Sequence, residues 1–186
     1  ADHPRLFFTD DTLPDIRDRL HRELYSRMFQ PLLDNIDSGN FFRPTNESDG
    51  RSVLMRARGH AKAYALTGDE SHPATARDDV TLALDLIGDD WDSPATRGLD
   101  LYTWAKDLAI IYDLCASSEA WGPVINYQAS SRLVDVAVVI AENGGSQQAN
   151  DPGSNWQANR GASAGSAFLA TDHQFASALG EAAHDR

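Results

Sequence analysis

One short segment, Ser154 to Arg160, gathers amide, indole and guanidinium side chains that together are poorly suited to a hydrophobic core. The residues of interest are Asn155, Trp156, Gln157, Asn159 and Arg160. They follow a Gly- and Asn-rich run, 143–153, and lead into a small-residue stretch, 161–170, that is expected to be helical. A helix N-terminus offers unpaired N–H groups and a partial positive charge, which favour a carboxylate. With an amide donor, a stacking indole and a guanidinium fork beside it, this junction predicts a site for a sugar acid.

The same residue types also have a structural interpretation. Asn155 could cap the helix, because Ser and Asn are favoured at that position, and Trp156 could pack as a hydrophobic staple. Two aromatic residues farther up the chain, Tyr102 and Trp104, are ambiguous in the same way. They follow a Gly-containing loop at the start of a predicted helix, so they either stack on a sugar at a cleft rim or belong to the core.

Three segments, spread over nearly the whole chain, carry a resemblance to known proteins. They are His3–Thr9 (HPRLFFT), Leu108–Leu114 (LAIIYDL), and Asn155-Trp156 followed by Gly161–Ala167 (GASAGSA). In this order they resemble the heparinase II/III-like and alginate-lyase-like polysaccharide lyases. The resemblance implies a lyase that cleaves an anionic, uronic-acid-containing polysaccharide or oligosaccharide by β-elimination, without a cofactor. It also implies a secreted or periplasmic protein, and the start Ala1-Asp2 would suit a chain whose signal peptide has been removed.

In such lyases an asparagine neutralises the carboxylate next to the proton that is removed, and the resemblance gives this role to Asn155. Gln157 or Arg160 would assist it. The base and the acid are usually a tyrosine and a histidine that lie downstream of the Asn segment, which here means beyond residue 186. Some relatives place a histidine beside the Asn, whereas this chain has Trp156 and Gln157. The substrate class and the identity of the base therefore stay open.

The charge balance excludes some partners and sets a condition on others. A net charge of −12 argues against nucleic acid, because no basic stripe exists to displace the counterions of phosphates. It would also repel a polyanionic glycan, so a uronate site must concentrate its cations locally. The candidate arginines for such a local cluster of cations are Arg56, Arg58, Arg132 and Arg160. Lysine occurs only as Lys62 and Lys106.

The hydrophobic pattern predicts an all-α protein. Helices are expected over about 12–32, bent or ended at Pro31, and over about 52–66, 71–88, 99–117, 124–142, 156–169 and 172–183. Short loops between them indicate antiparallel helix hairpins, in either a solenoid or an (α/α) toroid, and no stretch alternates as a strand. The resemblance makes these hairpins part of an incomplete (α/α) toroid. We expect residues 1–186 to form a single all-α domain, the N-terminal portion of a longer catalytic domain, and no apolar run is long enough to span a bilayer.

Several other patterns have alternative interpretations. A toroidal glycoside hydrolase would need a carboxylate pair such as Asp107 and Asp113, and a non-catalytic scaffold would bind a glycan or peptide in its cleft. Gly161-Ala162-Ser163-Ala164-Gly165 matches the nucleophile elbow G-x-S-x-G but lacks the preceding strand, so close helix packing at the glycines is the simpler interpretation. His60 and Tyr64, four residues apart, could form an acid/base pair. No histidine pair has metal-ligand spacing in the sequence, so no metal is expected, and Cys115 is expected to be a buried, inert thiol.

Overall fold

The protein is helical throughout the part described by the computed structural model, which comprises Leu6, Thr9 and residues 11–42, 46–92, 94–143 and 155–171. The α-helices are α1 (Leu13–Leu20), α2 (Glu23–Asp37), α3 (Gly50–Thr67), α4 (Ser71–Ile87), α5 (Pro94–Cys115), α6 (Pro123–Asn143) and α7 (Asn155–Thr171). A short 3₁₀ turn, Gly88–Asp92, joins α4 to α5. The all-α prediction is confirmed for these residues, whereas the helix expected over 172–183 lies outside them.

Local sequence explains where these helices begin and end. The side chain of Asp49 accepts a hydrogen bond from the Arg51 N–H and caps the start of α3. Gly68 ends the same helix in the left-handed conformation, with φ of 74°, which a residue without Cβ adopts at little cost. Gly98, with φ of 24° and ψ of −102°, kinks α5 near its start, close to the predicted beginning at residue 99.

The first predicted helix is wrong in two respects. The chain breaks after Leu20, and α1 and α2 are separate helices rather than one. Pro31 does not end the helix, because α2 continues to Asp37 although a proline inside a helix loses one backbone hydrogen bond. Leu24 and Met28 of α2 recur at helical spacing but are 70% and 68% exposed, because α2 packs chiefly against the short α1.

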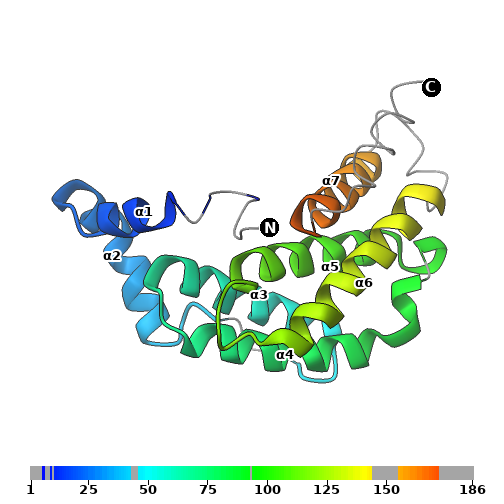
Figure 1. Ribbon diagram of the computed structural model, residues 1–186, viewed down its shortest axis with the longest axis horizontal. Helices are drawn as coiled ribbons and strands as arrows, with labels where there is room; N and C mark the ends of the chain where they lie inside the picture. The colour runs from blue at the N-terminus through cyan, green and yellow to red at the C-terminus, as the bar shows by residue number, and fades with distance from the viewer. Residues whose placement is uncertain are drawn as a thin grey trace.

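The remaining helices form two layers. Helices α3, α5 and α7 pack side by side, α4 packs against α3, and α6 packs against α5 and α7. In Figure 1, α4 runs along the lower edge of the molecule, and α7 lies on the side of α5 that is away from α4. The core between the layers holds large side chains that are fully buried, including Trp91, Trp121, Leu54, Leu108 and Leu133.

Two ion pairs fix the register between α3 and α5. Arg51 contacts Asp100 with Nη1 and Oδ1 3.1 Å apart, and Arg58 contacts Asp107 at 2.5 Å. Both pairs join residues 49 positions apart, so the two helices run parallel. Helix α7 has the same direction, because Ser163 in its first half contacts Tyr102 and its end, Thr171, lines a hollow with Tyr112. The N-termini of α3, α5 and α7 therefore gather at one end of the layer.

Candidate functional site

The predicted sugar-acid site lies at the N-terminus of α7. The helix begins at Asn155, one residue before the predicted start, so the loop-to-helix junction is where the sequence placed it. Gln157 in the first turn is exposed and Asn159 is partly buried. The side chains of Asn155 and Trp156 lie outside the described part of the structure, so their proposed roles stay predictions.

Arg160 connects this junction to the preceding helix. Its Nε donates to the carbonyl oxygen of Ile140 at 2.9 Å, and its Nη2 donates to that of Ala141 at 2.6 Å. These carbonyls belong to the last turn of α6, where a cation is favoured by the partial negative charge of the helix end. The guanidinium predicted to bind a substrate anion thus holds the first turns of α7 against α6.

Tyr102 and Trp104, which the sequence left between cleft rim and core, are 1% and 7% exposed. The indole of Trp104 packs edge-on against Trp91, with ring centroids 5.7 Å apart. Rings buried to this degree offer no face on which a pyranose could stack. Burial raises the pKa of Tyr102 and the charge of Arg160 opposes that shift, so the phenol lies within electrostatic range of the α7 junction. Its hydroxyl has no hydrogen-bond partner among the described residues.

The carboxylates considered for a glycoside hydrolase are both buried and both in use. Asp107 is 1% exposed and holds Arg58, while Asp113 is 0% exposed. Oδ2 of Asp113 accepts a hydrogen bond of 2.9 Å from the backbone N–H of Leu6. This contact joins two of the three segments that carry the family resemblance. Carboxyl groups without access to solvent cannot flank a glycosidic bond, so the geometry gives the hydrolase no support.

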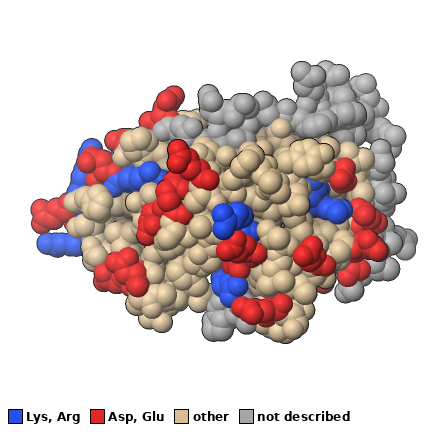
Figure 2. All heavy atoms as spheres, turned by 60° about the horizontal axis from the view of Figure 1, so that its bottom comes forward, with Lys and Arg blue, Asp and Glu red and all other residues tan. Residues whose placement is uncertain are grey.

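The arginines proposed as local cations have different surroundings. Arg56 forms a two-point ion pair with Asp79 of α4, and Arg132 lies 3.5 Å from Asp92. Arg58 is paired with Asp107, and in addition Lys62 and Lys106 share its neighbourhood. Figure 2 shows one face of the molecule, where acidic side chains are spread widely among fewer basic ones, in keeping with the net charge of −12.

His60 meets a partner that the sequence reasoning missed. Its Nδ1 lies 3.1 Å from Nδ1 of His72 on α4, and its ring stacks on Phe42 with centroids 3.9 Å apart. Burial, and then the nearby charge of His72, lower the pKa of His60 to about 4. The sequence did not indicate this pair, because the two histidines are twelve residues apart and lie on different helices.

Tyr64, considered as the partner of His60, instead donates its hydroxyl proton to Oε1 of Glu70 at 3.0 Å. Burial, followed by the hydrogen bond to Glu70, raises the pKa of Tyr64 to about 12. A phenol with a raised pKa is a poor base near neutral pH. The proposed acid/base pair is therefore split between two separate contacts.

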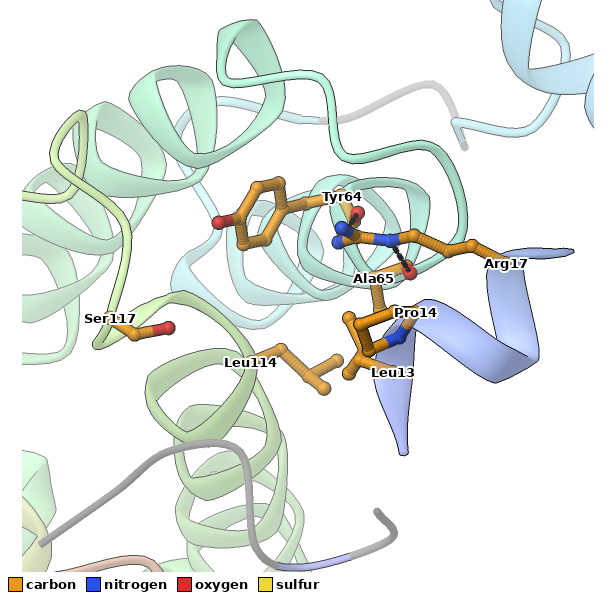
Figure 3. Close-up of a pocket in the computed structure, with 7 residues that line it drawn as sticks. All are labelled: Leu13, Pro14, Arg17, Tyr64, Ala65, Leu114 and Ser117. Atoms are coloured by element: carbon orange, nitrogen blue, oxygen red, sulfur yellow. Dashed lines mark hydrogen bonds between the residues drawn. The ribbon is translucent and has the colours of Figure 1, made fainter. Parts of the chain in front are cut away.

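A pocket of about 260 Å³ lies at the opposite end of the layer, where α3 and α5 end (Figure 3). It is lined by Leu13, Pro14, Arg17, Tyr64, Ala65, Leu114 and Ser117. Arg17 crosses it and donates to the carbonyl oxygens of Tyr64 and Ala65 at 3.0 and 2.9 Å. Since these carbonyls end α3, Arg17 acts as a helix cap, and the pocket is remote from Asn155.

The G-x-S-x-G segment lies inside α7 rather than at a strand-to-helix turn. Ser163 is buried, and its Oγ lies 2.6 Å from the carbonyl oxygen of Tyr102 and 2.7 Å from that of Asn159. The close-packing interpretation of the glycines is wrong within the described structure. A Cβ added at Gly161 or Gly165 would meet nothing within 4 Å.

Comparison with protein-family models, with curated proteins and with solved structures finds no match to this chain. Among the described residues, no three His, Cys, Asp or Glu side chains are grouped so that they could hold a metal ion. No described helix is both long and apolar enough to cross a membrane.

Proposed function

We propose that this protein is a polysaccharide lyase that cleaves a uronic-acid-containing glycan by β-elimination, and that its helix layers are part of an (α/α) toroid. The observation that carries the proposal is the position of Asn155 at the first residue of α7. Because α3, α5 and α7 run parallel, this residue lies at the end of the layer where three helix N-termini gather.

The chemistry needs a donor at the uronate carboxylate. Removing the proton at C5 builds negative charge next to a group that is already an anion, so the reaction is slow unless that charge is stabilised. Asn155 would donate a neutral hydrogen bond to the carboxylate, and the first N–H groups of α7 would add the partial positive charge of a helix end. Arg160 would serve by fixing this turn against α6.

The proton transfers are the less complete part of the mechanism. A base must accept the C5 proton and an acid must protonate the departing glycosidic oxygen. The described residues next to the junction supply no exposed histidine or tyrosine for these steps, because Tyr102 is buried. The resemblance gives the base and acid to later residues of the polypeptide.

The test follows ultraviolet absorbance of the unsaturated product while the purified protein is mixed with a panel of uronate polymers. We expect absorbance to rise with one polymer and the turnover number of Asn155→Ala to fall about 100- to 1,000-fold, the usual loss for such a donor. Gln128→Ala, which removes an exposed amide from α6, is the matched control and should keep full activity.

Other outcomes would overturn the proposal. New reducing ends without absorbance would indicate a hydrolase. Silence in both measurements, with a glycan still bound, would indicate a binding scaffold. Full activity in Asn155→Ala would remove this residue from the mechanism even if the protein is a lyase.

A further inference from the structure

Both lysines of the chain lie at the same place in the fold. Lys62 is one turn beyond Arg58 on α3, and Lys106 is next to Asp107 on α5. Because Arg58 and Asp107 are in contact, the two lysines are brought to one seam between the helices. Arg58, Lys106 and Lys62 all act electrostatically on the Asp107 carboxyl, so both lysines lie within electrostatic range of the Arg58–Asp107 pair.

The cluster has a local charge opposite to that of the protein. Three cations and one carboxylate leave a formal charge of +2, on a chain whose net charge is −12. Neither lysine forms an ion pair with any residue that the structure describes, although acidic residues outnumber basic ones by 28 to 16. Two unpaired ammonium groups beside a fixed guanidinium are suited to an anion from outside the chain.

The cluster is also open to a ligand. The α4-facing side of α3 is marked by Arg56, His60 and Tyr64, whose partners Asp79, His72 and Glu70 lie on α4 or directly before it. Two residues along a helix turn the side chain by about 200°, so Arg58 and Lys62 point away from α4. Lys62 is accordingly exposed, while Arg58 and Lys106 are partly exposed.

We propose that Lys62, Lys106 and Arg58 form an anion subsite that binds carboxylate or sulfate groups of a glycan strand, away from the bond that is cleaved. The choice of a glycan rests on the proposed lyase function. The subsite lies between α3 and α5, and α5 packs directly against α7. Only α5 therefore separates the subsite from the helix that begins at Asn155. Asp107 is a positioning residue that holds Arg58, and the lysines make the contacts with the anion.

The first test uses the scarcity of lysine. The protein is acetylated with an amine-reactive ester, and modification of Lys62 and Lys106 is followed by mass spectrometry with and without polymer. We expect both lysines to be protected by unsulfated polygalacturonate or by dextran sulfate, and by neutral dextran not at all. Protection by polygalacturonate assigns the site to carboxylates, and protection by dextran sulfate alone assigns it to sulfates. Equal modification under all conditions would overturn the inference.

The second test measures the dissociation constant of the protecting polymer by calorimetry. Lys62→Gln with Lys106→Gln should weaken binding roughly tenfold or more at low salt, because one charge-assisted contact is worth about a power of ten. Lys62→Arg with Lys106→Arg should keep binding. Arg22→Gln with Arg27→Gln removes the same charge from an exposed region and should change binding little. An equal loss in this control would show that only net charge matters and would refute the subsite.

The outcome is separable from that of the lyase proposal. Asn155→Ala should lose turnover and keep lysine protection, whereas the double glutamine variant should raise KM with little change in kcat. Protection without any lyase activity would leave an anion-binding site on a protein of another function. Lyase activity without protection would leave the enzyme and remove the subsite.

Discussion

Two ion pairs of the same chemical type on α3 allow a direct test of how burial sets the value of a charge pair. Arg56 and Asp79 make two hydrogen bonds, with Nε to Oδ2 2.8 Å and Nη2 to Oδ1 2.5 Å. Their side chains are 24% and 5% exposed. Arg51 and Asp100 make one contact of 3.1 Å, and their side chains are 52% and 46% exposed.

Replacing each aspartate by asparagine keeps the side-chain shape and removes the charge. In Asp79→Asn the amide NH₂ would face a guanidinium N–H, and a partly buried cation would lose its partner, a change that costs about 3–5 kcal/mol when burial is complete. Arg56 keeps some solvent and a contact of 3.5 Å with Glu47, so we expect a loss of about 2–3 kcal/mol in unfolding free energy. Asp100→Asn should cost about 0–1 kcal/mol.

The assay is urea unfolding followed by circular dichroism, with both midpoint and slope recorded for each variant. The small effect of Asp100→Asn should vanish in 1 M salt, whereas that of Asp79→Asn should persist, because burial limits screening. Arg56→Met with Asp79→Leu should recover much of the lost stability, since an apolar pair needs no partner. Equal losses in the two asparagine variants, or a loss below about 0.5 kcal/mol in Asp79→Asn, would refute the argument from burial.

Three further predictions concern stability and reactivity. The pKa of His60 is about 4 in the folded protein, against about 6.5 when exposed, so between these pH values the unfolded state binds more protons. Stability should therefore fall as the pH drops from 6.5 to 4. His60→Gln should make the urea midpoint depend less on pH across this window. Gly68→Ala should lower the unfolding free energy by about 1 kcal/mol or more, because φ is 74° and the new Cβ would lie 3.1 Å from Arg17 Nη1, whereas Gly165→Ala should be neutral or stabilising by up to about 1 kcal/mol; thermal melts of both variants check the contrast. Cys115 is buried and its thiol pKa is raised by burial, so a thiol reagent should label it only after denaturant is added, and rapid labelling of the folded protein would contradict the structure.

Helix positions were predictable because each depends on short-range pattern. The helix expected over 124–142 is α6, Pro123–Asn143, and the one expected over 156–169 is α7, Asn155–Thr171. The first helix was predicted wrongly because its packing depends on tertiary structure, which the local pattern does not contain. A periodic apolar stripe predicts a helix, but it does not show whether a neighbour covers the stripe, and Leu24 and Met28 stay exposed.

Side-chain pairs between helices were not predictable, because they depend on register. Helical spacing pairs His60 with Tyr64 on its own helix, yet the contacts of His60 come from Phe42 and from His72 on α4. The register of α3 and α5 matches a spacing in the sequence, but this spacing can be interpreted only once the two helices are known to be parallel. Arg51 and Arg58 are seven residues apart, and so are Asp100 and Asp107.

The two sides of α3 use charge for different purposes. On the side facing α4, Arg56 is paired with a buried carboxylate, so a substitution there should change stability and leave glycan binding alone. On the opposite side, Lys62 and its neighbour Lys106 have no acidic partner among the described residues, and a cation kept without a partner contributes little to folding. Removing these lysines should therefore leave the urea midpoint nearly unchanged and weaken polyanion binding. Because Arg56 and Lys62 lie on different sides of α3, the two effects can be measured independently in the same protein.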